Sequence, residues 1–301
     1  MPILDELRKL TQDDIVDGVI ETIKDTDELF GILPFRKVNG GALQVTWEET
    51  IPSATFIAPD GTIPKSTGRT FTQFKDGIKV IAQDIDIPNF STEVEGADED
   101  VMLYGEIKAI ARTYKKNVVI GNEEANPLVF NGLNKHIERA ENLGLQRSID
   151  VVSSSLTFEM LDDLISIMKM GIDVLIMNPK TYNEYKKLLR EKAGGTDAAM
   201  MQLKNFGKPV LTYEGIPIIK NENIPLEKDD DGNVITNIYA AVLDENEGVC
   251  GLYAGDNAGI SYKYLGEVQD KDAARYRFKW YCGFTVLNPH AIATIKNVKV
   301  A

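Results

Sequence analysis

The chain contains few of the residues that most often carry chemistry, because its 301 residues include two cysteines and two histidines. Cys250 and Cys282 stand in apolar stretches, which is typical of small buried side chains and provides no disulfide framework. A reducing compartment fits this pattern. His136 and His290 lie far apart and have no Cys, Asp or Glu at ligand spacing. They are interpreted as surface or structural residues, and not as part of a zinc site or catalytic triad.

The chain also lacks an excess of positive charge, with 33 Lys and Arg against 46 Asp and Glu and a net charge of −13. Proteins that grip nucleic acid cluster Lys and Arg, but here Lys115–Lys116 and Lys186–Lys187 are isolated pairs. Sequence-specific nucleic-acid binding is therefore not expected. No apolar run approaches the length of a membrane span, and the acidic N-terminal residues do not resemble a signal peptide. No membrane partner is expected.

Known site motifs are incomplete in this sequence. Gly207-Lys208 is followed by Pro209 and lacks the upstream glycine of a phosphate-binding loop. Asp229 and Asp231 match part of a calcium loop, but Ile238 stands where a bidentate glutamate is required. A solvated hairpin turn explains these acids better. Catalytic residues, cofactors and metal ligands are not expected, and the chain is predicted not to be an enzyme.

Residues 43–87 predict a long extended hairpin. Apolar and polar residues alternate in both arms, and Pro59-Asp60-Gly61 marks a turn between them. Each arm of about 15 residues would span ~50 Å, whereas a compact chain of this size has a radius of gyration of only ~19 Å. The hairpin is therefore expected to rest on identical neighbours. The residues predicted to make this inter-subunit contact are Trp47, Phe56, Asp60, Gly61, Lys65, Phe71 and Phe74.

A long helix is predicted over residues 98–120. Acids at its start and Lys115–Lys116 near its end suit the helix dipole, and Gly121-Asn122 stops it. Its apolar residues recur in steps of three and four, which places them on one face. That face consists of Val101, Tyr104, Ile107, Ala111, Tyr114 and Val118.

The remaining pattern predicts an α+β fold. Residues 12–29 read as an amphipathic helix, and further helices are expected near 158–170 and from Pro179 onward. The stretch with Pro127 and Gly132, between the long helix and the helix near 158, reads as a loop. Val174–Met177 reads as a short buried strand, and most of the chain after Lys208 reads as strands, including 275–283 and 285–287, before a last short element at 290–298. The alternating strand-and-helix order of dinucleotide or barrel enzymes is missing.

The order of these parts resembles the major capsid protein of tailed double-stranded DNA phages. Short segments also resemble that family, and the match of their order, more than any single motif, makes the resemblance specific. These segments are Ile120–Asn122, Phe130–Leu133, Met177–Tyr182, Tyr213–Ile218, Arg277–Tyr281 and Asn288–Ala293.

The resemblance implies the domain organisation of that family. Its parts would be an N-terminal arm at 1–42, an extended β-hairpin loop at 43–87, a peripheral domain at 88–172 and 259–287 with a spine helix at about 98–120, and an axial domain at 173–258 and 288–301. The sequence shows no long N-terminal scaffolding extension before the arm, so scaffolding is expected either from a separate protein or from an extension missing from this chain. Lys65 and Lys75 lie where some relatives form a Lys–Asn crosslink, but no matching Asn or Glu aligns, so non-covalent assembly is expected.

The resemblance further implies a function as the structural subunit of a virion capsid, assembled in the host cytoplasm. Copies would form hexamers and pentamers that close into an icosahedral shell around packaged DNA. A scaffolding protein, a portal and decoration proteins are the partners that such a subunit implies. The acidic net charge would then let the enclosed DNA move along a wall that repels it.

Two other interpretations stay open at this point. The same fold serves encapsulin-type nanocompartments, whose shells hold an enzyme cargo, and packaged DNA in purified particles would separate the two kinds of shell. A soluble enzyme with an unrecognised site would instead be a monomer or small oligomer that turns over a substrate.

Overall fold

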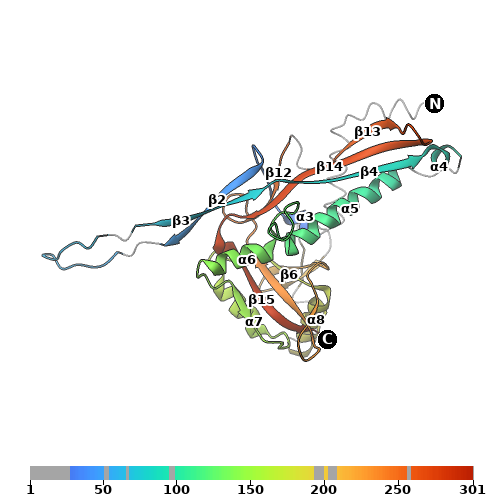
Figure 1. The fold of residues 1–301 in the computed structure, drawn as a ribbon. Helices are drawn as coiled ribbons and strands as arrows, with labels where there is room; N and C mark the ends of the chain where they lie inside the picture. Colours follow the sequence, from blue (N-terminus) through green and yellow to red (C-terminus); the bar gives the residue numbers. More distant parts are fainter. Residues whose placement is uncertain are drawn as a thin grey trace.

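The computed structural model describes residues 28–50, 54–65, 68–94, 99–192, 200–202, 209–255 and 259–300. The molecule has a body built on two sheets, and a thin hairpin projects from one side of it (Figure 1). The amphipathic helix expected over 12–29 lies outside the described residues, except for its last two positions. These two open the short helix α3 (Glu28–Ile32).

The first sheet centres on the long strand β14 (Ala273–Val286). Along one edge β14 pairs with β12 (Val249–Tyr253) and β13 (Ser261–Glu267), and β1 (Phe35–Lys37) extends this side. Along the other edge β14 pairs with β4 (Lys79–Pro88) in an antiparallel register that runs from Ala273↔Pro88 to Cys282↔Lys79. Alternation in β14 turns Phe278, Trp280 and Phe284 to one face. Arg275, Arg277 and the exposed Tyr281 point to the other face.

The aromatic face of β14 packs on helix α5 (Glu99–Ile120). Ile107, Ile110, Tyr114 and Val118 of this helix are buried in the same cluster as Phe278 and Trp280. Tyr114 is fully buried, donates a hydrogen bond to the Gly283 carbonyl at 2.9 Å and lies 4.6 Å from Trp280 between ring centroids. The helix expected over 98–120 is therefore present as α5, and it packs on the first sheet from Ile107 to Val118.

Helix α6 (Leu133–Asn142) follows α5 after a connection at residues 121–132. A Cβ at Gly121 would lie 2.3 Å from the Phe130 carbonyl oxygen, so only glycine allows this close approach. The sequence analysis expected no helix here and was wrong. The apolar residues Leu133, Ile137 and Ala140 form a stripe too narrow to stand out among polar neighbours.

The second sheet forms the lower part of the body (Figure 1). Its strands in spatial order are β5 (Ser148–Asp150), β15 (Ile292–Val300), β11 (Val234–Ala241), β6 (Val174–Met177), β9 (Ile216–Lys220), β8 (Pro209–Tyr213) and β7 (Met200–Gln202), and β10 (Glu227–Lys228) pairs with β11. Helices α7 (Phe158–Ile167) and α8 (Pro179–Lys192) pack on it through a second apolar cluster.

Three strands differ from the expectations. The expected strands 275–283 and 285–287 are the single strand β14, because Phe284 continues its buried face. The short terminal element at 290–298 is a 3-10 turn, Pro289–Ala291, and then β15, which lies between β11 and β5. The returning arm of the expected hairpin divides after Gly77, where β4 leaves for the first sheet. The short helix α4 (Asn89–Glu93) follows β4.

Among the described residues, the model contains no helix whose length and apolar character would let it cross a membrane. Within this part of the chain the apolar residues gather in the interior clusters that join the two sheets. Tyr239 and Ile219 of the second sheet belong to the same cluster as Tyr114 of α5. The body is therefore one continuous packed unit.

Replacing Ile107 by aspartate should prevent folding of the body. Ile107 is 7% exposed and faces the sheet, so a carboxylate there would be buried without a partner. We expect a loss of more than about 4 kcal/mol, seen as loss of the cooperative unfolding transition by circular dichroism. Thr113→Asp is the matched control, because Thr113 lies on the exposed face of the same helix. Normal folding of Ile107→Asp would contradict the assignment of the buried face.

Candidate assembly hairpin

Strands β2 (Ala42–Thr50) and β3 (Thr70–Gly77) form the projecting element, here called the hairpin and covering residues 42–77. They pair in an antiparallel register from Ala42↔Gly77 to Thr50↔Thr70, with an irregularity between Glu48 and Thr50. No third strand pairs with them in the described part of the chain. A two-stranded ribbon of this kind is marginal in water, so its stability depends on what it touches.

The half of the hairpin nearest the body is packed inside its own subunit. Val45 and Trp47 are buried, and the Trp47 indole donates a hydrogen bond to the Val286 carbonyl at 3.2 Å. Phe74 meets the Trp47 ring edge-on with centroids 4.9 Å apart. Trp47 and Phe74, both predicted for an inter-subunit contact, therefore lie in the core of the chain itself, and we do not assign them to a contact between copies.

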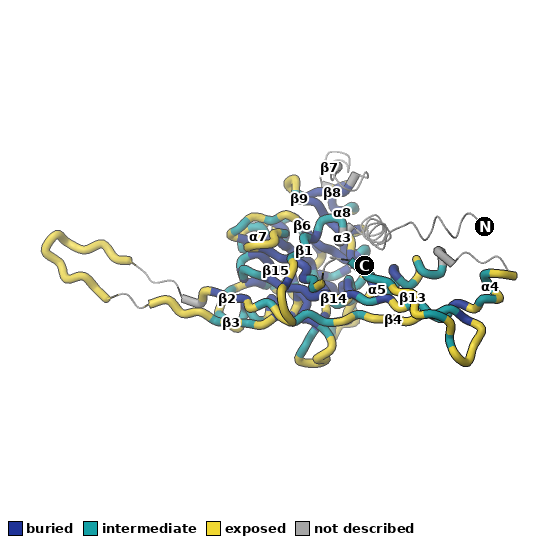
Figure 2. The backbone as a smooth tube through the Cα atoms, turned by 90° about the horizontal axis from the view of Figure 1, so that it is seen from above, coloured by how far each residue is buried: buried dark blue, intermediate teal, exposed yellow. Residues whose placement is uncertain are grey.

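The far end of the hairpin, here called the tip and covering residues 54–65, is exposed throughout (Figure 2). The relative exposure of Phe56 is 108% and that of Ile63 is 79%, so both side chains project into solvent. Asp60 and Gly61 form its turn, where Gly61 N–H donates to the Ala58 carbonyl at 2.8 Å. Lys65 lies at the end of the tip and is also exposed. Large apolar side chains that gather at one exposed end are typical of an interaction surface.

Phe71 extends the exposed apolar surface onto strand β3, where it faces away from the body with 56% of its surface in solvent. Opposite it, Glu48 forms an ion pair with Arg69 at 3.3 Å. Gln44 and Gln73 share a hydrogen bond on the same face. This face of the hairpin is therefore mainly polar, and its apolar residues concentrate toward the tip.

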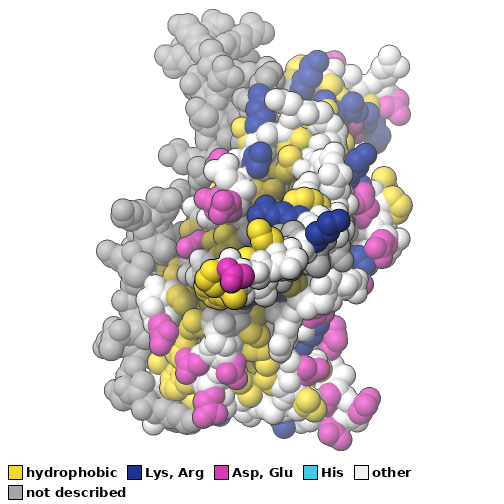
Figure 3. Space-filling model, turned by 90° about the vertical axis from the view of Figure 1, so that its left-hand side faces the viewer, with side chains coloured by type: hydrophobic (Ala, Val, Ile, Leu, Met, Phe, Trp, Pro, Cys, Tyr) yellow, Lys and Arg dark blue, Asp and Glu magenta, His cyan; other side chains and the backbone are white. Residues whose placement is uncertain are grey.

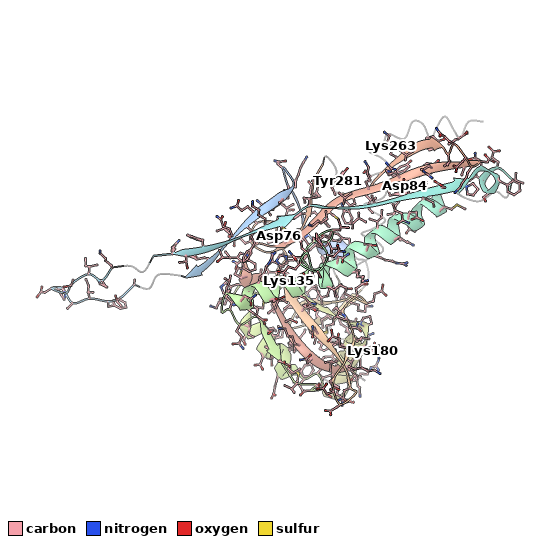
Figure 4. The ribbon with its side chains drawn as sticks, in the orientation of Figure 1. Asp76, Asp84, Lys135, Lys180, Lys263 and Tyr281 are labelled. Atoms are coloured by element: carbon pink, nitrogen blue, oxygen red, sulfur yellow. The ribbon has the colours of Figure 1, made fainter. Side chains whose placement is uncertain are left out.

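A buried carboxylate fixes the root of the hairpin. Asp76 is 4% exposed, and its two oxygens accept hydrogen bonds from Arg139 Nη1 at 2.8 Å and Thr285 Oγ1 at 2.7 Å. Figure 4 shows Asp76 where the hairpin meets the body, close to α6. The guanidinium carbon of Arg139 lies 5.0 Å from the centroid of the Phe74 ring. Strand β3, helix α6 and strand β14 of the first sheet are thus joined through the Asp76 carboxylate.

Sequence analysis missed Asp76, Arg139 and Thr285. The available signal was a charge at an inward position of an alternating strand, because Asp76 shares the inward face with Phe74 and pairs with Leu43. Such a charge requires a buried partner. The partners come from a helix that was not predicted and from a strand far along the chain, so their identity needed the fold.

His136 lies on α6 one turn before Arg139 and is completely buried beside Phe284, with ring centroids 5.9 Å apart. Burial lowers the pKa of His136 to about 4, although the nearby Asp76 acts in the opposite direction. The imidazole is therefore neutral at physiological pH, and it fills the space under the root of the hairpin as a packing residue.

Beyond the hairpin, paired charges line the outward face of β4 and β14. Arg275 binds Asp86 with two hydrogen bonds of 2.6 and 2.7 Å, and Arg277 binds Asp84 with two of 2.7 Å. The hydrogen bond from Arg277 is the main reason that the pKa of Asp84 is lowered. These bidentate pairs sit opposite each other in the strand register and add geometric definition to a long ribbon.

The predicted face of the long helix is distributed over three environments. Ile107, Tyr114 and Val118 are buried, Ala111 is half-buried and Tyr104 is 36% exposed. Lys108 Nζ lies 4.1 Å from the centroid of the Tyr104 ring. The side chain of Val101 lies outside the described part of the structure.

The described residues hold no group of three or more His, Cys, Asp or Glu suited to a metal ion. Cys250 and Cys282 are buried, and burial raises the pKa of the Cys250 thiol to about 12. His290 lies against Arg147, with 2.6 Å between Arg147 Nη2 and His290 Nδ1. The Asp229 carboxylate accepts from Asn233, closing the turn between β10 and β11. These residues have structural contacts of their own.

Charges are unevenly spread on the face from which the hairpin projects (Figure 3). Lys and Arg side chains gather above the hairpin in this view, and Asp and Glu side chains gather below it, while hydrophobic atoms cover the end of the hairpin. On this face the hairpin therefore separates a mainly basic surface from a mainly acidic one.

Comparison with known proteins gives a consistent result. Residues 129–301 match a family model described as type 2A encapsulin shell protein, SrpI-like. A 101-residue stretch is 33% identical to the type 2A encapsulin shell protein SrpI of Synechococcus elongatus. That stretch covers 32% of this chain and 31% of the relative, so the sequence alignment spans about a third of each protein.

Solved structures extend the likeness to most of the chain. The holo-SrpI encapsulin complex of Synechococcus elongatus PCC 7942 superposes with a TM-score of 0.66 at 18% identity, covering 90% of this chain and 87% of SrpI. The capsid of a native GTA particle gives 0.64 at 14% identity, with coverage of 92% and 90%. These similarities show that the chain has the α+β fold common to capsid and encapsulin shell proteins.

The buried His136 predicts a pH dependence of stability. Its pKa is about 4 when folded and 6.5 when exposed, so the unfolded chain binds more protons between these values. Stability should therefore fall as the pH drops from 6.5 to about 4, by about 3 kcal/mol from this residue.

His136→Phe, which keeps an aromatic ring beside Phe284, should lack that part of the pH dependence in urea unfolding curves. His290→Phe is the comparison: burial also lowers the pKa of the partly buried His290, so this variant should remove a smaller part of the pH dependence than His136→Phe. Equal pH slopes for the wild type and His136→Phe would refute the argument.

Proposed function

Because the chain belongs to the SrpI-like family of type 2A encapsulin shell proteins, whose model matches residues 129–301, we propose that its copies assemble into the closed shell of a nanocompartment. The chain is a structural protein and not an enzyme. The observation that carries the proposal is the hairpin, whose apolar tip has no cover within its own subunit. A neighbouring copy is the partner that a self-assembling shell always provides.

The expectation of a phage major capsid protein is wrong, because the matching family is that of encapsulin shells. The expectations that depended on it are wrong as well: the virion location, the packaged DNA, the portal and the scaffolding protein. The reason is physical: a long hairpin, a long helix and a mixed domain specify how a shell subunit folds, and phage capsids share that fold. What the shell encloses leaves no mark on those elements.

Protein cargo is the enclosed partner that fits this family, and we include it in the proposal. The net charge of −13 agrees with a shell that has no need to hold nucleic acid. Cargo would be recognised by a specific surface of the shell, and the acidic composition suits electrostatic discrimination between partners.

The domain organisation belongs to the same proposal, with boundaries adjusted to the elements. The first sheet and α5 would be the peripheral domain with its spine helix, and the second sheet with α7 and α8 would be the axial domain. Residues 1–41 would be the N-terminal arm. The extended loop would be the hairpin at 42–77, since β4 pairs with β14 over its whole length.

A closed shell would require each hairpin to leave its own subunit and lie on the next. The elongated shape supports this arrangement, because the tip projects well beyond the body (Figure 1). Contact between a tip and a different surface of the next copy is heterologous, and such contacts close into rings and shells when the rotation between copies is right.

Replacing Phe56 and Ile63 together by asparagine should leave the subunit folded and impair assembly. Both side chains project into solvent, so their loss costs the monomer little, whereas a shell contact would lose apolar burial worth ~25 cal/mol for each Å². We expect particles to be at least about tenfold less abundant by size-exclusion chromatography and negative-stain microscopy.

Val152→Asn is the matched control, because Val152 is 80% exposed and follows strand β5 at the edge of the second sheet. Normal shells from the Phe56 and Ile63 variant would exclude the tip as an assembly contact. A wild-type protein that stays monomeric under all conditions, with or without cargo, would overturn the shell function itself. Co-purified DNA that resists nuclease would instead revive the phage interpretation.

A further inference from the structure

The hairpin joins the body at a single change of sheet on its returning strand. Strand β3 ends at Gly77 and β4 begins at Lys79, with Ile78 between them. Ile78 N–H donates to the Gly41 carbonyl at 2.9 Å, so the two strands of the hairpin meet the body side by side. We call residues 77–78 the hinge.

Small rotations at the hinge have large effects at the tip. The tip turn lies about 17 residues from Gly77, which corresponds to ~50 Å in an extended strand. A tilt of ~10° would therefore displace the tip by ~9 Å, more than the width of a side chain. A contact between neighbouring tips and bodies cannot tolerate such a displacement, so the direction of the hairpin has to be set at its root.

Before the hinge, Asp76 is held on both of its oxygens. Arg139 of α6 binds one at 2.8 Å, and Thr285 of β14 binds the other at 2.7 Å. The Asp76 side chain is 4% exposed and that of Arg139 is 18% exposed, so the pair is shielded from salt and water. The carboxylate cannot rotate without losing one of these two bonds.

After the hinge, Lys79 is held in a similar way. Its Nζ donates to Glu123 Oε1 at 2.6 Å and to the Pro127 carbonyl at 2.7 Å, and 16% of its side chain is exposed. Glu123 is itself fixed by Asn131, which accepts from the Glu123 N–H at 3.0 Å and donates to Oε2 at 3.2 Å.

Both anchors end on one rigid corner of the body. Glu123, Pro127 and Asn131 belong to the turn between α5 and α6, and Arg139 lies on α6. Gly132 N–H donates to the Gly121 carbonyl at 2.8 Å, which closes the turn against the end of α5. The hinge thus carries a negative charge on one side and a positive charge on the other, and each meets its opposite on the same corner.

We propose that Asp76 and Lys79 are positioning residues that set the direction in which the hairpin leaves the body. The inference rests on the proposed shell function for its purpose, although the fixed direction is a property of the single subunit. Shell curvature would then depend on two ion pairs that form within the single subunit.

Direction, more than stability, is what such pairs supply. The desolvation of buried charges offsets much of their attraction, so an ion pair is weak support for net folding energy. Trp47, Val45 and Phe74 already hold the hairpin to the core by apolar contact. Apolar contact is not directional, whereas bonds from the two sides of a carboxylate are.

The test measures the direction itself. One spin label is placed on Asp60→Cys at the tip and a second on Arg112→Cys, on the exposed side of α5. Pulsed electron paramagnetic resonance then measures the distance between the two labels, and thus between the hairpin and the body. Native Cys250 and Cys282 are buried and should not be labelled. Labelled subunits are diluted into unlabelled ones, so that only distances within one subunit contribute.

Asp76→Asn and Lys79→Met should each broaden this distance distribution about twofold and give particles of mixed size. Lys79→Arg retains a cation for Glu123 and should restore the narrow distribution. Asp84→Asn is the matched control: it removes a carboxylate paired with Arg277 on strand β4, away from the hinge, and should change neither measurement.

An unchanged distribution in Lys79→Met would overturn the positioning role of Lys79. The same result in Asp76→Asn would overturn that of Asp76. Broadening in Asp84→Asn as well would show that any lost ion pair loosens the ribbon, which also refutes the proposal. If the wild type shows a narrow distribution but forms no particles, the shell function fails while the hinge argument stands.

Discussion

The contact between strand β14 and helix α5 is the constraint on which the rest of the molecule depends. Tyr114 is fully buried there, between Trp280 and the Gly283 carbonyl. Along one edge of the same strand, β4 is paired over ten residues. Strand β14 therefore fixes the positions of α5, of β4 and of the root of the hairpin. A change that separated β14 from α5 would release all three.

The elements with strong local signals could be predicted from the sequence. After Asn39-Gly40-Gly41 the sequence changes to strand period, and the helix over 99–120 repeats its apolar residues regularly. The change of sheet at Gly77 could not be predicted, since β4 continues the same alternation and only its partner β14 differs. Asp76 shows the same limit: its inward position was readable, but Arg139 and Thr285 were not.

The distinction between a viral capsid and a cellular compartment was beyond pattern reading for a related reason. Both kinds of shell need a subunit that reaches its neighbour and resists bending, and the α+β fold meets those needs in both. The identity that separates them resides in the sequence of residues 129–301, where the family match lies. Periodicity and charge are blind to it.

The long separation between Trp47 and Val286, 239 positions along the chain, has a consequence for how the protein is made. At ~5–20 residues per second, a ribosome needs ~10–50 s to proceed from one to the other. During that time the Trp47 indole and the apolar tip both face solvent on an incomplete chain. Trp47 therefore gains its hydrogen-bond partner only when nearly the whole chain has been made, so the root of the hairpin is completed late in synthesis.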